Sequence, residues 1–266
     1  MSKYIAGFIG AGNMGGIIAS AVAKSVGSEN VAVCCSTPES TKIAAERVGC
    51  CEATMMDACS SKYVFLGIKP QMVQSVLPEV AKYIKNQDCI VVSMLAGTTV
   101  ETLCKLCETD KVIRIMPNTP AQVGEGVTLI CSSYNVSDEE LNEFCSMISL
   151  TGKTDVIPEK FFDAATALSG CGPAFVYMFL EALADGAVKC GLPRDKACEY
   201  AAQMVLGASK FALSSDKHTS ELKDAVCSPG GSTIEGVLCL EKEGMRSAVM
   251  DAVCASYEKS KRLGKG

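Results

Sequence analysis

The sequence predicts an α/β domain with a parallel sheet over residues 1–157, followed by an all-α domain over residues 158–266. Three observations predict this order. Short, continuous apolar runs alternate with helical segments up to Pro158, which is typical of a parallel sheet covered on both faces. A glycine-rich turn joins the first apolar run to the first helical segment. Strand signals stop after Pro158, where glycines and prolines separate long helical segments.

The elements of the first domain follow in order. The apolar run 4–9 is the first strand, and a helix over 14–26 follows its glycine turn. Gly49 closes a helix over 40–48, and Lys69-Pro70 ends the strand over 63–68. Ser137-Asp138-Glu139-Glu140 has the capping-box pattern that opens a helix. The other strands are expected at 31–35, 89–94, 112–116, 127–131 and 154–157, and the other helices at 71–83 and 99–105.

The second domain is predicted to be helical throughout, with helices at 159–169, 174–190, 194–214, 220–226, 233–243 and 245–263. The helix that begins Ala174-Phe175-Val176-Tyr177-Met178 is apolar on nearly all sides, so most of its surface must be buried. The rest of this short domain offers little surface to bury it. We therefore expect a second copy of the chain to cover it in a two-fold homodimer. Burial entirely within one copy is the alternative.

The composition is that of a globular protein with one large or two modest domains. Of the 266 residues, 48% are hydrophobic and 21% are charged, so enough apolar surface exists to offset chain entropy. The net charge of −5 argues against nucleic acid as a partner, because phosphate binding needs a basic face. No run of 18 uncharged apolar residues occurs, and we expect no membrane partner.

The sixteen cysteines and the single histidine restrict the chemistry further. Disulfide scaffolds are normally short and secreted, and the adjacent pairs Cys34-Cys35 and Cys50-Cys51 would bridge only with strain. Cys104-Lys105-Leu106-Cys107 has CxxC spacing, but no second such pair completes a zinc site. We expect free thiols in a cytoplasmic protein without a metal site. His218 lies in a polar connection, where a solvated loop residue is expected rather than a catalyst.

The segment Gly10-Ala11-Gly12-Asn13-Met14-Gly15 matches the fingerprint G-x-G-x-x-G. It follows a predicted strand and opens a predicted helix, which is the context that dinucleotide binding requires. The first glycine allows the tight turn, the second lets the backbone approach a diphosphate, and the third lets helix and strand pack closely. The first domain is therefore predicted to be Rossmann-like. A glycine-rich turn without a ligand is the alternative.

The end of the second strand favours NADPH over NADH. An acidic residue there would hold the 2′-hydroxyl of NADH, but the sequence has Cys34-Cys35-Ser36-Thr37-Pro38 at this point. The hydroxyls of Ser36 and Thr37 can donate to a 2′-phosphate without repelling it, and NADH remains possible. Lys42 and Arg47 are too far along the chain to be assigned. The same residues also suit a simple helix-start turn.

Further special residues fall at the carboxyl ends of strands, where open α/β sheets bind ligands. These are Lys69-Pro70, Ser93-Met94-Leu95-Ala96-Gly97 and Met116-Pro117-Asn118-Thr119-Pro120. In the second domain, Ser228-Pro229-Gly230-Gly231-Ser232-Thr233 precedes a helix. Its glycines free backbone N–H groups and its hydroxyls lie at the helix start, which suits a carboxylate. A loop with an ordinary N-cap is the alternative.

Five segments together resemble the pyrroline-5-carboxylate reductase family, in the right order and over nearly the whole chain. They are 8–15, Ile68-Lys69-Pro70, 114–120, 167–174 and 224–234, and the sequences Leu-Ser-Gly-x-Gly-Pro-Ala and Ser-Pro-Gly-Gly are more specific than the glycine fingerprint. The resemblance implies NAD(P)H-dependent reduction of 1-pyrroline-5-carboxylate to L-proline, the last step of proline synthesis. It also implies a helical C-terminal dimerisation domain and, often, a ring of five dimers.

The resemblance also implies the site residues. Ser228, Gly231, Ser232 and Thr233 would hold the substrate carboxylate, Thr233 would be catalytic through a hydrogen bond near the ring nitrogen, and Glu159 would lie on the substrate side. The cyclic imine is basic enough to be protonated in solution, so no dedicated acid is required. The implied cofactor contacts are Ile9, Gly10, Ala11, Gly12, Asn13, Met14, Ser36, Thr37, Gly67, Ile68, Lys69, Pro70, Met94, Leu95 and Ala96.

The chain departs from the family pattern at Cys171, where serine is usual, and at Thr54 and Ala225, where some relatives carry asparagine. These departures bear on cofactor affinity and on the choice between NADH and NADPH.

Two rival functions fit the same domain plan. A 3-hydroxyacid dehydrogenase would need a basic lysine, for which Lys189 and Lys210 are the nearest candidates. A dinucleotide-binding sensor would bind cofactor without turnover.

Overall fold

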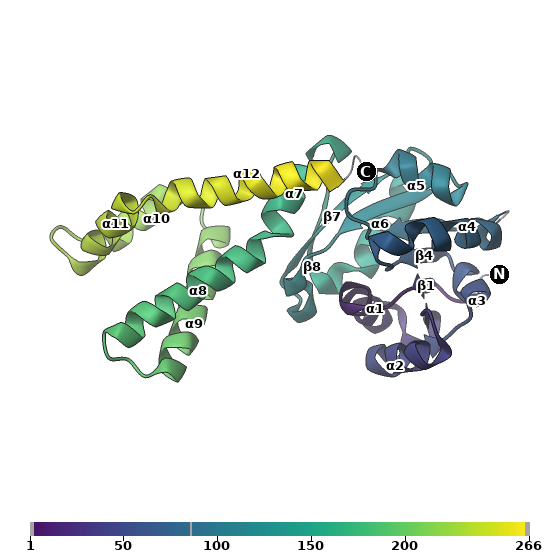
Figure 1. Cartoon of the computed structure of the whole chain (residues 1–266), viewed down its shortest axis with the longest axis horizontal. Coiled ribbons are helices and arrows are strands. Elements are labelled where there is room, and N and C mark those ends of the chain that lie inside the picture. The colour runs from purple at the N-terminus through teal and green to yellow at the C-terminus, as the bar shows by residue number, and fades with distance from the viewer. Residues whose placement is uncertain (1–2, 86, 264–266) are drawn as a thin grey trace. The chain divides into compact units, whose positions relative to one another are not determined.

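The computed structural model describes residues 3–85 and 87–263 and forms two compact units (Figure 1). The first unit contains the chain up to Cys171 together with the end of the last helix, from Ser256 onwards. The second unit spans Gly172–Ala255. The boundary at 157/158 stays a proposal about where the helical architecture begins. The compact units divide later, because Phe162 is fully buried in the core of the first unit.

The first unit is built on one eight-stranded sheet with the order β3-β2-β1-β4-β5-β6-β7-β8. The strands are β1 (Ala6–Ile9), β2 (Val31–Cys34), β3 (Cys51–Glu52), β4 (Tyr63–Leu66), β5 (Ile90–Ser93), β6 (Val112–Met116), β7 (Gly126–Ser132) and β8 (Gly152–Val156). Phe8 of β1 lies beside Val33 of β2 and Phe65 of β4, and the two phenyl rings stack at 4.2 Å. The chain therefore adds β2 and β3 on one side of β1 and the strands from β4 onwards on the other side. This reversal of strand order places a ligand-binding switch point between β1 and β4.

Helices cover both faces of this sheet. They are α1 (Asn13–Val26), α2 (Pro38–Val48), α3 (Met55–Cys59), α4 (Val73–Ile84), α5 (Val100–Cys107) and α6 (Asp138–Met147). Alternate residues of each strand enter different cores. Phe8 packs with side chains of α1, α2 and α6, whereas Ile9 packs with side chains of α3, α4 and α5. The predicted doubly covered α/β sheet is confirmed.

Two details of the first unit differ from the prediction. The elements β3 and α3 were not predicted, because they are only two and five residues long and carry too little periodicity to detect. The sheet is also not wholly parallel, because β7 runs antiparallel to β6. A parallel crossover needs about a dozen residues or more, and the connection 117–125 is too short to provide it.

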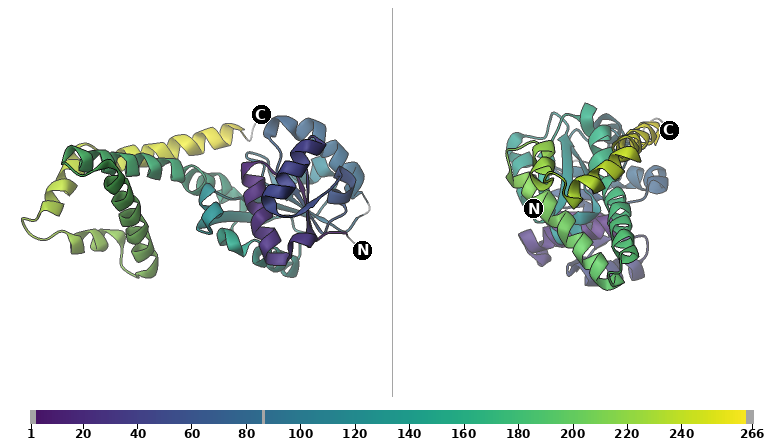
Figure 2. Two further views of the ribbon diagram at one scale, coloured as in Figure 1. Left: turned by 90° about the horizontal axis from the view of Figure 1, so that it is seen from below. Right: turned by 90° about the vertical axis from the view of Figure 1, so that its left-hand side faces the viewer.

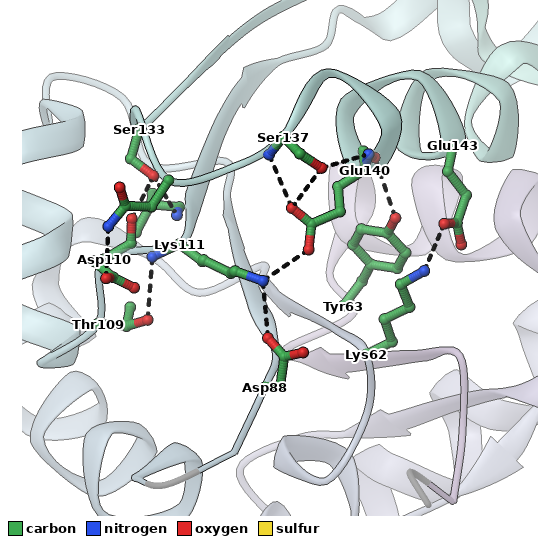
Figure 3. A network of polar contacts seen from close by, with 12 residues as sticks. Lys62, Tyr63, Asp88, Thr109, Asp110, Lys111, Ser133, Ser137, Glu140 and Glu143 are labelled. Carbon is green, nitrogen blue, oxygen red and sulfur yellow. Dashed lines mark hydrogen bonds and ion pairs between the residues drawn. The ribbon is translucent and has the colours of Figure 1, made fainter.

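A charged network secures the amino ends of the strands (Figure 3). Lys111, just before β6, donates to Asp88 and to Glu140 at 2.8 Å each, and Glu140 completes the capping box of α6 with Ser137. The hydrogen bonds to Asp88 and Glu140 raise the pKa of Lys111, and the bond from Lys111 lowers the pKa of Glu140. Ligands bind at the opposite, carboxyl edge of such sheets, so this network supports the fold.

The chain beyond the sheet is helical, as predicted (Figure 2). A short 3₁₀ turn (Glu159–Phe161) precedes α7 (Phe162–Ser169), which is followed by α8 (Gly172–Lys189), α9 (Arg194–Ser214), α10 (Thr219–Val226), α11 (Ser232–Lys242) and α12 (Met245–Leu263). Within the second unit, α8 packs along α9. Val176, Tyr177 and Met178 of α8 nevertheless remain 42%, 60% and 70% exposed. The stretch Glu159–Lys189 has the length and composition of a membrane-crossing helix, with 11% of its most apolar window buried.

Candidate functional site

The glycine loop lies where the prediction placed it, between β1 and α1 at the switch point. Gly10 has φ +85°, a conformation that side chains rarely adopt. A Cβ on Gly67, after β4, would lie 2.2 Å from the carbonyl oxygen of Gly10, and one on Gly15 would lie 2.8 Å from the same oxygen. A Cβ on Gly12 would meet no atom within 4 Å. Gly10, Gly15 and Gly67 thus allow the backbone to pack closely, while Gly12 leaves the outer side of the loop open.

This open side faces a cavity of about 460 Å³. Ser36 and Ser40 line it from the α2 side. Among the described residues no carboxylate lines it, whereas Arg47 and Lys69 bring two cations to its wall. A space with open backbone N–H groups and two cations, to which the described residues bring no anion, fits a diphosphate. The predicted cofactor residues that line it are Ile9, Gly10, Ala11, Gly12, Ser36, Gly67, Ile68 and Lys69.

The structure places the remaining predicted cofactor residues around this cavity rather than on its wall. Met14 lies in the first turn of α1, and Asn13 lines a separate cavity of about 720 Å³ along α1. Met94 lies against Gly67, since its Cε would be 3.3 Å from a Cβ there. Leu95 is 2% exposed and packs in the core, so its side chain cannot reach a ligand. Ala96 follows it in the same loop, and Pro70 begins a 3₁₀ turn.

A second cavity, of about 410 Å³, adjoins the first at Ser36. Thr37 lines it, but its hydroxyl accepts a hydrogen bond from the backbone of Ser40 and caps α2, so the helix-start role is present. Thr54 caps α3 and donates to Asp57 at 2.9 Å. This bond, and one from Lys3, lower the pKa of Asp57. This carboxylate was not among the predicted site residues, because α3 was not predicted.

Arg47 is the other site residue that the sequence analysis left unassigned. It lies in the last turn of α2, and its Nη2 donates to the carbonyl oxygens of Ala11 and Gly12 in the glycine loop, the second at 3.2 Å. No pattern in the sequence signals this contact, because the partners are far apart along the chain.

In the second unit, Ser228–Gly231 forms a tight turn that leads into α11. The N–H of Gly231 donates to the carbonyl of Ser228 at 3.0 Å, with Pro229 and Gly230 (φ +66°) in the middle positions. This is the residue pattern of a type II turn. Gly231 is the N-cap of α11 and offers no side chain to it. The hydroxyls of Ser232 and Thr233 bond to no other described residue, so they and the first N–H groups of α11 can receive a carboxylate.

Glu159 lies in the first unit, where Oε1 accepts hydrogen bonds from the backbone N–H of Val100 at 2.8 Å and from Arg114 at 2.9 Å. Arg114 is buried, and its guanidinium lies 4.2 Å from the centre of the Phe162 ring. The other carboxylate oxygen, Oε2, has no hydrogen bond within residues 3–85 and 87–263. One oxygen of Glu159 therefore connects the start of α7 to the sheet.

The states of the cysteines and of His218 follow from their surroundings among the described residues. All sixteen cysteines are free, and no three His, Cys, Asp or Glu side chains among the described residues group as metal ligands. Burial raises the pKa of the thiols of Cys59, Cys107 and Cys131 to about 12. His218 caps α10, because its Nδ1 accepts a hydrogen bond from the backbone of Ser220.

Comparisons with known proteins agree over both parts of the chain. A family model described as pyrroline-5-carboxylate reductase dimerisation matches residues 159–263, and one described as NADP oxidoreductase, coenzyme F420-dependent, matches residues 5–97. The pyrroline-5-carboxylate reductase of Pisum sativum is 40% identical over 98% of this chain and 96% of its own. That of Escherichia coli K12 is 38% identical over the full length of both chains.

Solved structures give the same result. The crystal structure of Plasmodium falciparum pyrroline carboxylate reductase with NADP bound has a TM-score of 0.88 and 32% identity over 99% of both chains. The enzyme of Streptococcus pyogenes has a TM-score of 0.87 and 34% identity over 96% of this chain and 97% of its own.

Proposed function

This chain belongs to the pyrroline-5-carboxylate reductase family, and from this premise we propose that the glycine-loop cavity and the turn before α11 are its cofactor and substrate sites. The protein is an oxidoreductase that uses NADPH to reduce 1-pyrroline-5-carboxylate to L-proline, the last step of proline biosynthesis. The observation that carries the cofactor assignment is the cavity beside the open face of Gly12, which Arg47 and Lys69 line and no carboxylate of the described residues does.

The cofactor site would be formed by the residues that the resemblance implies. N–H groups of the loop Ala11–Asn13 and of the start of α1 would bind the diphosphate, with Lys69 as a nearby cation, while the N–H of Gly10 donates to the carbonyl of Cys34. Ser36 lies where the two cavities meet, and its hydroxyl would contact the ribose and its 2′-phosphate. When bound, NADPH supplies the hydride. Use of NADH in addition is part of the proposal, since the second cavity is lined by the carboxylates of Glu52 and Asp57 as well as by three threonines.

The substrate site would be the turn Ser228–Gly231 and the first residues of α11. The unpaired N–H groups there, with the hydroxyls of Ser228, Ser232 and Thr233, would bind the substrate carboxylate. Thr233 would also hydrogen-bond near the ring nitrogen and hold it in place. Glu159 is proposed for the substrate side through its free Oε2, since Arg114 and Val100 occupy only Oε1.

Proton transfer would need no residue with a tuned pKa. The imine nitrogen of the substrate is protonated in water near neutral pH, and the single histidine is engaged in capping α10. The chain would then contribute binding and orientation, which lower a barrier by roughly 7–11 kcal/mol when reacting groups are well placed. Loss of activity at high pH would follow the substrate nitrogen rather than a protein group.

The assembly follows from the helical region. The chain self-associates through its dimerisation region, which includes the exposed apolar face of α8. We propose that a second copy, rather than lipid, covers the apolar stretch Glu159–Lys189, that five dimers form a ring, and that the enzyme is cytoplasmic. No nucleic acid partner is proposed, since the net charge is −5.

The direct test is to mix the purified chain with NADPH and 1-pyrroline-5-carboxylate and to follow the absorbance of NADPH. We expect oxidation of NADPH and formation of L-proline, with slower use of NADH. A series of 3-hydroxy acids with NADP⁺ is the control for the dehydrogenase alternative, and Lys189 and Lys210 are both exposed and without hydrogen-bond partners among the described residues. Turnover of the hydroxy acids alone would overturn the proposal, and binding without turnover would indicate a sensor.

A further inference from the structure

The guanidinium of Arg47 reaches from the last turn of α2 to the glycine loop. Its Nη2 donates to the carbonyl oxygen of Ala11 and, at 3.2 Å, to that of Gly12. Arg47 also lines the 460 Å³ cavity that those loop residues line. The described residues offer no carboxylate within salt-bridge distance of Arg47, so its charge is not neutralised by an acid.

Gly16 gives Arg47 the space for this contact. Gly16 follows the last glycine of the fingerprint and is buried within α1, where glycine is less favourable than alanine. A Cβ at this position would lie 2.6 Å from Nη2 and 3.3 Å from Cζ of Arg47, and its next neighbour would be the oxygen of Ala11 at 3.5 Å. A side chain at residue 16 would therefore displace the guanidinium from the loop.

The two carbonyls that Arg47 holds determine where the loop N–H groups point. A peptide unit is planar, and its N–H is directed opposite to its C=O. Fixing the carbonyls of Ala11 and Gly12 therefore fixes the N–H groups of Gly12 and Asn13, which are donors of the proposed diphosphate site. The guanidinium also offsets the negative ends of these two carbonyl dipoles close to the place where an anion would bind.

We propose that Arg47 is a positioning residue of the cofactor site and that Gly16 is present to admit it: Arg47 holds the glycine loop with the N–H groups of Gly12 and Asn13 ready for the diphosphate. The inference rests on the proposed function of this loop. Because the diphosphate is common to both nucleotides, Arg47 acts equally on NADPH and NADH. A direct contact with the 2′-phosphate would instead act on NADPH alone.

The test measures the Kd of NADPH and of NADH by calorimetry for Arg47→Ala, Arg47→Lys, Gly16→Ala and the double variant. We expect Arg47→Ala to raise both Kd values by about tenfold, the effect of losing charge-assisted hydrogen bonds, and Arg47→Lys to recover part of the loss. Gly16→Ala should act like Arg47→Ala in the parent chain and add little on the Arg47→Ala background. Lys42→Ala is the matched control, since Lys42 is an exposed cation of the same helix without a hydrogen bond to any described residue.

Each result bears on the proposal. Unchanged Kd values in Arg47→Ala, a loss confined to NADPH, or a Gly16→Ala effect that adds fully to that of Arg47→Ala would overturn it. A fall in Tm with unchanged Kd values would show a merely structural role. If Arg47→Ala does not fold, the Kd values of Arg47→Lys and Gly16→Ala are compared with those of the parent chain instead. A parent chain that binds neither nucleotide would contradict the proposed function itself. Failure of the proposed function is thereby distinguished from failure of the role proposed for Arg47.

Discussion

The hydroxyl of Thr233 lies exposed in the first turn of α11 and bonds to no other described residue. In the proposed site it holds the ring nitrogen of the substrate. Thr233→Ala should therefore lower kcat/KM for 1-pyrroline-5-carboxylate by about 10-fold to 100-fold, the range for one hydrogen bond to a charged group. Steady-state kinetics at saturating NADPH measures this, and the Kd of NADPH should not change.

Thr219→Ala is the matched control for Thr233, because Thr219 is an exposed threonine in the first turn of α10 in the same unit. Its kcat/KM should equal that of the parent. If Thr233→Ala also kept the parent value, Thr233 would have no part in the mechanism.

The buried cysteines make the fold sensitive to alkali. Burial raises the pKa of Cys59, Cys107 and Cys131 from 9.0 to about 12. A raised pKa in the folded state means that stability is fully present below pH 9 and is lost as the pH rises towards 12, because only the unfolded chain releases these protons readily. Each thiol should reduce the free energy of unfolding by up to about 1.4 kcal/mol per pH unit in this window.

Urea unfolding at pH 7, 9 and 10 checks this dependence. Cys131→Val replaces one buried thiol by a side chain of similar size and should make the alkaline loss shallower, whereas Cys190→Ala, at an exposed cysteine, should not. Equal slopes in all three proteins would contradict the assigned pKa values.

Residues near one another in sequence were predictable from chemistry, and residues brought together by the fold were not. The packing roles of Gly10 and Gly15 were predictable, because each has a local backbone reason, and the role of Gly12 towards a diphosphate stays a prediction. Arg47 was left unassigned because its contact with Ala11 depends on how α2 crosses the start of α1. Thr37 shows that a local pattern can also be ambiguous. A hydroxyl at this position suits both a helix cap and a ligand contact, and the structure shows the cap.

At the scale of elements, the junction of β1 and α1 separates two roles for glycine. A methyl group at residue 12 enters open space, whereas one at residue 15 would lie 2.8 Å from the carbonyl oxygen of Gly10. Gly12→Ala should keep the parent Tm but weaken NADPH binding, because the methyl group occupies the side that the diphosphate approaches. Gly15→Ala should also lower the free energy of unfolding by about 1–3 kcal/mol, since strand and helix must move apart.

Thermal unfolding and calorimetric titration with NADPH give both quantities for the two variants. Gly12→Ala that binds NADPH as tightly as the parent would contradict the placement of the diphosphate. Equal Tm losses in both variants would contradict the packing at this junction.

Element prediction succeeded where a segment was long or clearly capped. The helices α9 and α12 have the predicted bounds, and Ser137 and Glu140 form the expected capping box. The two-residue β3 and five-residue α3 lack a period long enough to detect. The antiparallel β7 was missed because the direction of a strand depends on the length of the connection before it, which apolar pattern alone does not encode.

At the scale of the whole molecule, we propose that the exposed face of α8 forms the interface between copies of the chain. Met178 is 70% exposed in one copy of the chain, within a helix that the dimerisation model covers. Met178→Glu should dissociate the assembly, because a charge would be buried against the second copy. Sedimentation velocity measures the mass and also tests for the ring of five dimers. The control is Tyr134→Glu, since Tyr134 is fully exposed in the first unit. An intact assembly in Met178→Glu would place the interface elsewhere.

The account depends on two ligand sites, one for a diphosphate at the glycine loop and one for a small carboxylate at the turn before α11. A crystal structure of the chain with NADP⁺ and L-proline tests both together. We predict that the diphosphate lies on the N–H groups of Ala11–Asn13 and the proline carboxylate on those of Ser232 and Thr233. A proline carboxylate bound at any other place, with the turn before α11 empty, would contradict the account.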